Sequence, residues 1–200
     1  MELEHLLRRR KMVRSFRQEP VAPETIDRVM ACVVHAPSAG YSQGNEFLVL
    51  DAPADVAAFL RLVEHPDFPT PPEHRGVEPP VIVLVLANAG AYTTRYSAPD
   101  KIQFGLDKPE NWPVPFWDVD AGMASMLILL AAIDNGLGAF FAGVFEPEAV
   151  TAHFGVPDRF RIVGMIGLGH PAEVDVASAD ASAFKLRRRP LSELVHHGHW

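Results

Sequence analysis

Ten of the eighteen Lys and Arg residues lie in two short clusters near opposite ends of the chain. The first cluster contains Arg8, Arg9, Arg10, Lys11, Arg14 and Arg17, and the second contains Lys185, Arg187, Arg188 and Arg189. The formal net charge of the chain is -7, so its overall composition does not explain this concentration of cations. Fixed positive charge beside a loop with Ser and Gly, here Pro37-Ser38-Ala39-Gly40, is what a bound phosphate requires. The pattern therefore predicts a phosphorylated cofactor, and a cofactor predicts an enzyme.

The length and composition indicate a single folded domain. With 200 residues and 48% hydrophobic content, the chain can bury a sizeable core. The acidic balance argues against a dedicated nucleic-acid or anionic-membrane surface, although the basic clusters keep a nucleic-acid binder among the alternatives. The N-terminal residues are charged from Glu2 onward and lack the apolar stretch of a signal peptide, and the apolar run at 123–133 is too short to span a bilayer. We therefore expect a cytoplasmic protein that binds neither nucleic acid nor membrane.

The cysteine and histidine content predicts no metal site. Cys32 is the only cysteine, which excludes an intrachain disulfide and a cysteine-rich zinc site, and its apolar neighbours suggest a buried structural thiol. A C-terminal cluster of His196, His197 and His199 has no evident carboxylate or cysteine partner. A solvated tail is the favoured interpretation of that cluster.

Hydrophobic periodicity predicts a mixture of helices and strands. An amphipathic helix is expected at 23–35, where Ile26, Val29, Met30 and Val33 recur at helical spacing. The aliphatic, β-branched run at 81–87 is typical of a strand buried on both faces. Further patterns predict strands at 47–50 and 160–168, and helices at 54–64, 119–135 and 147–154. Because these elements mix without strict βαβ repetition, an α+β fold is favoured.

Two segments suggest where a partner or ligand binds. The helix at 119–135 is apolar nearly all round and is closed by Gly136, so we expect it to be buried in the core or in a subunit interface. The segment 88–117 is aromatic, charged and interrupted by prolines, with no defensible period. Long segments of this kind are usually lids or binding segments. A substrate cover and an interface pad are equally compatible with its composition.

Five short motifs follow one another along nearly the whole chain. They are Arg10-Lys11-Met12-Val13-Arg14-Ser15-Phe16, Pro37-Ser38-Ala39-Gly40-Tyr41-Ser42-Gln43, Gly136-Leu137-Gly138-Ala139, Gly167-Leu168-Gly169-His170-Pro171-Ala172-Glu173 and Arg187-Arg188-Arg189-Pro190-Leu191-Ser192-Glu193-Leu194-Val195-His196. Together, and in this order, they resemble the FMN-dependent nitroreductase family. The resemblance implies a three-layer α/β/α sandwich with a mostly antiparallel central sheet. It implies one FMN-binding domain over residues 1–200, with 88–117 as a lid or interface excursion, and a homodimer whose subunits share the flavin sites.

The resemblance also implies which residues bind the cofactor. Guanidinium and ammonium groups suit a flavin phosphate because they form charge-assisted hydrogen bonds with it, although surface arginines are more often simple solubilising charges. A backbone N–H near Ala142 and Gly143 faces flavin N5 in the family, where a donor that does not titrate is suitable. The implied cofactor-binding residues are Arg10, Lys11, Met12, Arg14, Pro37, Ser38, Ala39, Gln43, Ala142, Gly143, Arg187 and Arg189. No catalytic side chain and no metal ligand is implied.

The implied reaction is a ping-pong oxidoreduction. NADH or NADPH reduces the flavin at N5, and a flat electron-poor acceptor (nitroaromatic, quinone or enone) is then reduced in the same pocket. Met12, Tyr41 and Ala142 depart from the family pattern, where Ser, Asn and, in some members, an acidic residue are found. None of these departures removes a cation, so flavin binding is still expected, whereas the natural acceptor and the choice of nicotinamide are not assigned. The alternatives are other flavin chemistry (dehalogenase, dehydrogenase or deazaflavin-linked reductase) and a flavin-binding module without turnover.

Overall fold

In the part of the chain that the structure describes, a four-stranded antiparallel sheet forms the centre. The computed structural model describes residues 2–64, 78–173 and 188–200. Its strands are β1 (Asn45–Leu50), β2 (Val81–Ala87), β3 (Gly138–Ala142) and β4 (Arg161–Gly169). They are arranged in the order β1-β2-β4-β3, and each neighbouring pair is antiparallel. The two interior strands are therefore β2 and β4.

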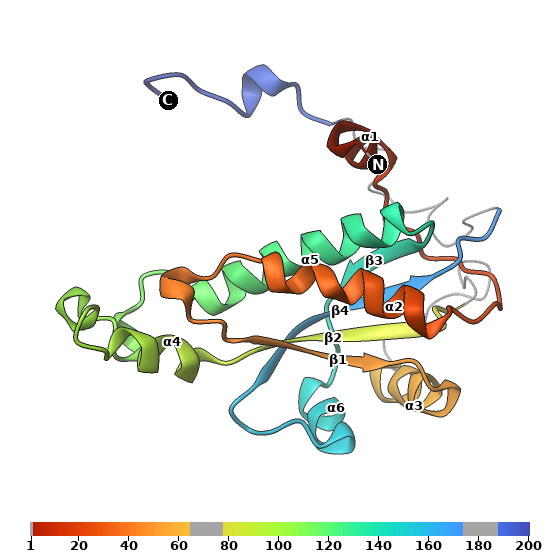
Figure 1. Cartoon of the computed structure of the whole chain (residues 1–200), viewed down its shortest axis with the longest axis horizontal. Helices are drawn as coiled ribbons and strands as arrows, with labels where there is room; N and C mark the ends of the chain where they lie inside the picture. Colours follow the sequence, from red (N-terminus) through yellow and green to blue (C-terminus); the bar gives the residue numbers. More distant parts are fainter. Residues whose placement is uncertain (1, 65–77, 174–187) are drawn as a thin grey trace.

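Helices cover both faces of this sheet (Figure 1). On one face lie α2 (Pro23–Met30) and α5 (Phe116–Asp134), and on the other lie α3 (Pro53–Val63) and α6 (Pro147–Phe154). Two further helices, α1 (Leu3–Arg9) and α4 (Ala89–Tyr96), lie outside these layers. Short 3-10 turns occur at η1 (Ala31–His35), η2 (Ala39–Tyr41), η4 (Ile102–Phe104), η5 (Pro109–Asn111) and η7 (Leu191–Glu193). The three-layer α+β arrangement expected from the sequence is confirmed.

Strand β2 separates two hydrophobic cores because its side chains alternate between the faces of the sheet. Val81, Val83 and Val85 pack in the cluster that contains residues of α2 and α5. The intervening side chains of β2 pack in the cluster that contains residues of α3 and α6. All seven residues of β2 are buried, as its unbroken aliphatic sequence predicted.

Helix α5 has both a buried and an exposed apolar side. Its buried side includes Ala124, Ile128 and Ala132, and the helix contacts all four strands of the sheet. Its length and composition would suffice to cross a membrane, but core helices of folded domains meet the same criterion, and this helix packs on the sheet. Four apolar residues on α5 stay more than a third exposed: Phe116, Val119, Met123 and Met126.

Four elements differ from the sequence-based expectation. The helix expected at 23–35 is α-helical only to Met30 and continues as the 3-10 turn η1, ahead of the extended residue that precedes Pro37. Strand β3 occupies residues expected to follow a simple turn, and α1 ends at the start of the first basic cluster, where it includes Arg8 and Arg9. The segment 88–117, in which no period was recognised, begins with α4, whose first turn is capped by Asn88. The side chain of Asn88 accepts a hydrogen bond from the Gly90 N–H, as N-cap residues do.

Glycines on β4 make room for aromatic rings of β3. A Cβ atom placed at Gly167 would lie 2.3 Å from the Phe140 ring, and one at Gly164 would lie 2.4 Å from the Phe141 ring. The Arg14 guanidinium lies over the Phe140 ring, 5.8 Å from its centroid. Gly167 thus supports the position of Arg14, a predicted cofactor-binding residue, through the Phe140 ring.

Replacement of Gly167 by Val is expected to lower the free energy of unfolding by about 3 kcal/mol, because the added side chain must displace Phe140 from a packed position. Urea unfolding would measure the loss. The control is Met165→Leu, a volume-conserving change at a buried position of the same strand, which should cost at most about 1.5 kcal/mol. A Gly167→Val variant as stable as the original protein would show that Phe140 is not held against β4.

Candidate functional site

The loop at residues 37–43 (the 37–43 loop) contains residues with positive φ, a conformation that side chains other than glycine disfavour. Gly40, Tyr41 and Gln43 all have left-handed conformations, with φ of 61°, 59° and 50°. Such a conformation costs a non-glycine residue roughly 1–3 kcal/mol and persists only when surrounding contacts impose it. Strained residues of this kind cluster at binding and catalytic sites.

Hydrogen bonds inside the loop account for part of this conformation. The Ser42 hydroxyl donates to the Ala39 carbonyl oxygen at 2.6 Å, and the Gln43 N–H donates to the Ser38 hydroxyl oxygen at 3.1 Å. The Tyr41 N–H donates to the Ser38 carbonyl oxygen at 2.9 Å. Ser38 therefore acts both as an acceptor at its side chain and as the first residue of the turn.

A cavity of about 520 Å³ opens beside the 37–43 loop. Pro37, Ser38, Tyr41 and Gln43 line it, together with apolar residues of η1 and β1 and with Ala124 of α5. The Tyr41 side chain is 75% exposed, so its ring is available to a ligand or to a second chain. The volume lies within the range usual for small-molecule sites.

The Arg10–Arg14 part of the N-terminal cluster lies along β3. The Val13 N–H donates to the Ala139 carbonyl oxygen at 3.0 Å, and Val13 itself is buried against Gly138, whose lack of a Cβ permits the approach. Met12 packs against the core of the α5 face, while Lys11 and Arg14 are exposed on either side of it. Lys11 and Arg14 therefore present their charges outward, while Val13 between them is buried.

Arginines from both ends of the chain line one cavity of about 550 Å³. Arg10 contributes from the C-terminal end of α1, and Arg188 and Arg189 contribute from the C-terminal segment. Arg189 also donates to Glu193, through Nε to the carboxylate at 3.2 Å and through Nη2 to the carbonyl oxygen at 2.7 Å. Arg187, predicted as a further phosphate contact, lies outside the described residues. The structure thus brings Arg10 and Arg189 together.

Ala142 and Gly143 occupy the end of β3. Ala142 is half-buried and pairs with Met165 of β4, and Gly143 follows as an exposed residue where the strand stops. A Cβ at Gly143 would contact nothing within 4 Å, so no steric requirement of this chain fold explains a glycine there. The predicted backbone donor is therefore at an open edge of the fold.

One protomer keeps the two parts of the predicted site apart. The Ala39 N–H donates to Asp120 in the first turns of α5, whereas Val13 is bound to Ala139, which follows the other end of that helix. From Asp120 to Asp134 the helix is about 21 Å long at 1.5 Å per residue. The 37–43 loop and the Arg10–Arg14 segment are therefore near opposite ends of α5.

Asp120 was not recognised from the sequence as a functional residue. Its side chain is 1% exposed, and Oδ2 accepts hydrogen bonds from the Ala39 N–H at 2.9 Å and from the Tyr92 hydroxyl at 2.7 Å. Burial raises the pKa of Tyr92, and the hydrogen bond to Asp120 raises it further. An acidic residue inside an apolar helix was the available signal, but the sequence does not show what it would contact.

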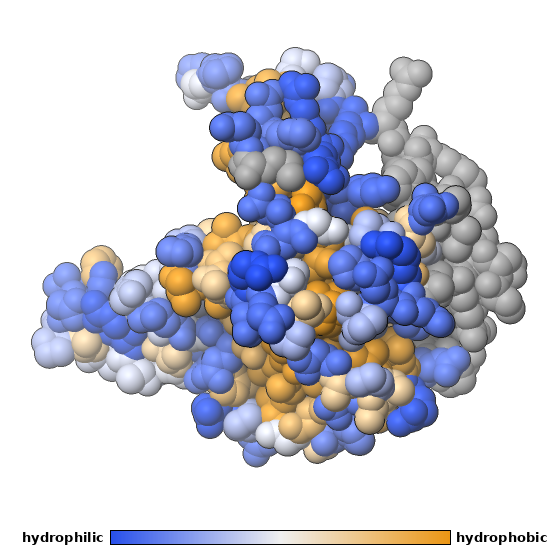
Figure 2. Space-filling model, turned by 45° about the vertical axis from the view of Figure 1, so that its right-hand side comes forward, coloured by the Kyte–Doolittle hydropathy of each residue, from blue (hydrophilic) through white to orange (hydrophobic). Residues whose placement is uncertain are grey.

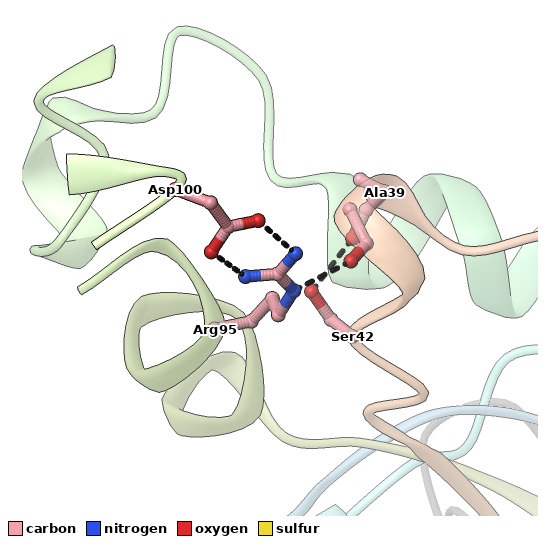
Figure 3. A network of polar contacts seen from close by, with 5 residues as sticks. Ala39, Ser42, Arg95 and Asp100 are labelled. Atoms are coloured by element: carbon pink, nitrogen blue, oxygen red, sulfur yellow. Dashed lines mark hydrogen bonds and ion pairs between the residues drawn. The ribbon is translucent and has the colours of Figure 1, made fainter. Parts of the chain in front are cut away.

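Arg95 of α4 was likewise seen only as one charge in an irregular segment. Its Nε donates to the Gly40 carbonyl oxygen at 2.9 Å, while Nη1 and Nη2 donate to the two oxygens of Asp100 at 2.8 and 2.7 Å (Figure 3). Neighbouring aromatic rings support the helix, with Tyr96 and Trp112 centroids 4.8 Å apart in an edge-to-face arrangement. The 88–117 segment therefore contacts the predicted cofactor loop directly.

The Arg95–Asp100 pair predicts a specific dependence of stability on pH. Hydrogen bonds from Arg95 lower the pKa of Asp100 from its ordinary 3.8 to about 2. Because this pKa is lower in the folded state, the pair stabilises the fold above about pH 4 and loses its effect as the pH falls towards 2. The thermal midpoint of the Asp100→Asn variant should therefore lie below that of the original protein by a constant amount from pH 5 to 7. This deficit in the midpoint should shrink below pH 4. A deficit unchanged at pH 3 would contradict this assignment.

Comparison with known proteins gives likenesses over most of the chain. The sequence profile described as the Nitroreductase family matches residues 7–170. The chain is 29% identical over 176 residues to a Rhodospirillum rubrum protein named 5,6-dimethylbenzimidazole synthase, covering 86% of this chain and 82% of that protein. It is 26% identical to an Archaeoglobus fulgidus protein named "Putative NADH dehydrogenase/NAD(P)H nitroreductase", covering 86% and 87%. A Desulfovibrio desulfuricans structure, "a putative nitroreductase in complex with fmn", is similar with a TM-score of 0.66 and 24% identity over 100% of this chain and 98% of that one.

Proposed function

Because the chain belongs to the nitroreductase family, we propose that it is an FMN-dependent oxidoreductase. It would pass reducing equivalents from NADH or NADPH to a flat electron-poor acceptor (a nitroaromatic, quinone or enone) in ping-pong order. The observation that supports this most directly is the cavity in which Arg10, Arg188 and Arg189 converge from opposite ends of the chain. Converging guanidinium groups in a chain of net charge -7 are suited to a dianionic phosphate.

The residues on the phosphate side would suit FMN in charge. Arg10 and Arg189 would bind the phosphate, Glu193 would orient Arg189, and Lys11 and Arg14 would add contacts along the outward side of the segment beside β3. By family resemblance Arg187 would join them.

The residues on the ring side would orient the flavin and restrict access to it. Pro37, Ser38, Ala39 and Gln43 would hold the ring and ribityl chain through backbone and hydroxyl groups, and Met12 would pack beside them. The backbone of Ala142 and Gly143 would supply a neutral hydrogen-bond donor near the reactive edge of the ring. When bound, FMN supplies the chemistry of hydride transfer, and the protein supplies position and electrostatics.

A homodimer with shared sites would join the two parts that one protomer holds apart. If two copies pack with their α5 helices antiparallel, the 37–43 loop of one copy lies beside the arginine-lined cavity of the other. The exposed apolar residues of α5 provide a surface for this contact, and apolar surface is visible both on the body and on the projecting terminal segments (Figure 2). Leu3, Leu7, Leu191 and Leu194 are among the exposed residues of those segments. We propose this dimer as the functional unit, in the cytoplasm.

The absorbance spectrum of the purified protein is the experiment that tests this function. The proposal predicts a yellow protein whose flavin band bleaches on anaerobic addition of NADH or NADPH and returns on addition of menadione or nitrofurazone. A yellow protein that neither nicotinamide bleaches would support a flavin-binding module without turnover. A colourless protein that does not bind added FMN would overturn the proposal, and salt-dependent retention on DNA would then favour the nucleic-acid binder.

Other flavin chemistry is a second candidate, because one relative at 29% identity is named 5,6-dimethylbenzimidazole synthase. Incubation of the FMN-loaded protein with NADPH in air, followed by mass spectrometry for 5,6-dimethylbenzimidazole, would detect that activity. Turnover of a halogenated phenol, compared with nitrofurazone and menadione, would detect a dehalogenase. A nitroreductase-type enzyme would turn over only the latter two acceptors.

A further inference from the structure

Two polar contacts reach adjacent residues of the 37–43 loop from outside it. Asp120 of α5 accepts from the Ala39 N–H at 2.9 Å, and Arg95 of α4 donates to the Gly40 carbonyl oxygen at 2.9 Å. Each contact restrains one side of the same short turn, immediately before Tyr41. The left-handed conformations of Gly40 and Tyr41 begin where these two contacts attach.

Asp120 connects the loop to α4 as well as to α5. The oxygen that accepts from Ala39, Oδ2, also accepts from the Tyr92 hydroxyl, and Tyr92 is fully buried in α4. The other oxygen, Oδ1, is buried and has no hydrogen-bond partner within the described part of the chain. Burial of a carboxylate costs free energy, which hydrogen bonds to the carboxylate are needed to offset. Here the needed bonds are those from Ala39 and Tyr92.

Arg95 is held rigidly enough to position its target. The carboxylate of Asp100 accepts hydrogen bonds from both terminal nitrogens of the guanidinium, and Nε donates to the Gly40 carbonyl oxygen (Figure 3). Tyr96, one helical turn after Tyr92, packs against Gly40, because a Cβ atom added at Gly40 would lie 2.7 Å from the Tyr96 ring. Successive groups on α4 thus contact the loop by hydrogen bond and by packing.

We propose that α4 is a clamp that positions the cofactor loop, with Arg95 and Asp120 as positioning residues that do not touch the reacting atoms. The clamp imposes the strained turn at Gly40 and Tyr41, and so sets where Ser38 and Ala39 meet the flavin. This inference rests on the proposed function, because the loop matters to FMN only if the protein binds FMN. It assigns the start of the 88–117 segment a role in cofactor binding rather than only in covering substrate.

The Asp120 contact is tested with a pair of variants. In Asp120→Asn, the remaining carbonyl oxygen can accept from both Ala39 and Tyr92, and the amide nitrogen replaces the oxygen that accepts no bond. This variant should bind FMN within about threefold of the original protein. In Asp120→Leu both bonds are lost, and the dissociation constant of FMN should rise about tenfold or more. Flavin fluorescence quenching measures both constants.

The Arg95 contact is tested with Arg95→Met and a control on the same helix. Arg95→Met keeps the aliphatic stem, loses the bond to Gly40, and should raise the FMN dissociation constant about tenfold. Thr94→Ala changes an adjacent exposed residue and should leave FMN affinity unchanged. Because the Arg95 side chain is partly exposed to solvent, the thermal midpoint of FMN-free Arg95→Met should lie no more than about 4 °C below that of the FMN-free original protein.

The outcomes separate the clamp from the proposed function. Failure of the original protein to bind FMN would contradict the function and not the contacts. If the original protein binds FMN and Arg95→Met binds it equally well, α4 is not a clamp. If Asp120→Asn binds FMN as weakly as Asp120→Leu does, the charge of Asp120 rather than its hydrogen bonds is needed. That result also overturns the positioning role. Altered stability of the FMN-free variants without a change in FMN affinity would assign these residues to the fold alone.

Discussion

Replacement of Arg10 by Ala is expected to weaken FMN binding by about 10- to 100-fold. Arg10 is half-buried, and it lines the cavity that also receives Arg188 and Arg189. A hydrogen bond to a charged group contributes about 1.5–3 kcal/mol, and each 1.4 kcal/mol is a tenfold change in affinity. Titration of the FMN-free protein with FMN, followed by fluorescence quenching, measures the change.

Arg8 provides the matched control for this experiment. It lies in the last turn of α1, which Arg10 directly follows, is exposed, and forms an ion pair with Glu4 at 2.6 Å. Arg8→Ala should change FMN affinity by less than about threefold, since exposed pairs of this kind contribute little. Equal losses in both variants would indicate general attraction between a basic segment and an anion. No loss in Arg10→Ala would remove the N-terminal cluster from the phosphate site.

Met126→Glu should convert a dimer to monomers and abolish FMN binding at micromolar concentrations. Met126 is 43% exposed on α5, within the apolar surface that the proposed dimer buries. A carboxylate buried in an apolar interface without a partner costs several kcal/mol, which raises the dimer dissociation constant by at least about 100-fold. Sedimentation measures the assembly state, and flavin absorbance after gel filtration measures the bound cofactor.

Met126→Leu preserves volume and hydrophobicity and should leave both assembly and FMN content unchanged. The coupling of the two readouts is the essential result, because each site would need the 37–43 loop of one copy and Arg10 of the other. If the Met126→Glu variant is monomeric and retains FMN, one protomer completes the site despite the separation along α5. If the Met126→Glu variant remains dimeric, this face of α5 is not the interface.

The elements that could be predicted from the sequence are those whose patterns need no tertiary information. The unbroken run at 81–87 gave the bounds of β2, and the helix expected at 147–154 has the bounds of α6. Strand β3 has only five residues and lies at a sheet edge, so its pattern is too short to distinguish from a turn. Helix α4 is held by aromatic contacts and by an N-cap, and its own sequence has no apolar stripe.

The sequence indicates a set of candidate site residues but not their arrangement. Residue type and family resemblance indicated Arg10, Ser38 and Arg189, because phosphate and flavin binding constrain the chemistry of such positions. The separation of Ser38 from Arg10 along α5, and the role of Asp120, depend on contacts between residues far apart in sequence. Asp120 and Ala39 are 81 positions apart, and no local pattern relates them.

The terminal segments that project from the body in Figure 1 have a consequence for proteolysis. Helix α1 contacts α5, but it has only seven residues and none of them is buried, and helices this short are marginal without extensive packing. Its last residues are arginines, after which trypsin cleaves. A lone protomer should therefore lose its N-terminal residues rapidly, whereas the proposed FMN-bound dimer should be protected at the same bonds. If the proposed function holds, the unassembled protein in a flavin-starved cell would be cleaved first just ahead of Arg10, a residue proposed to bind the cofactor.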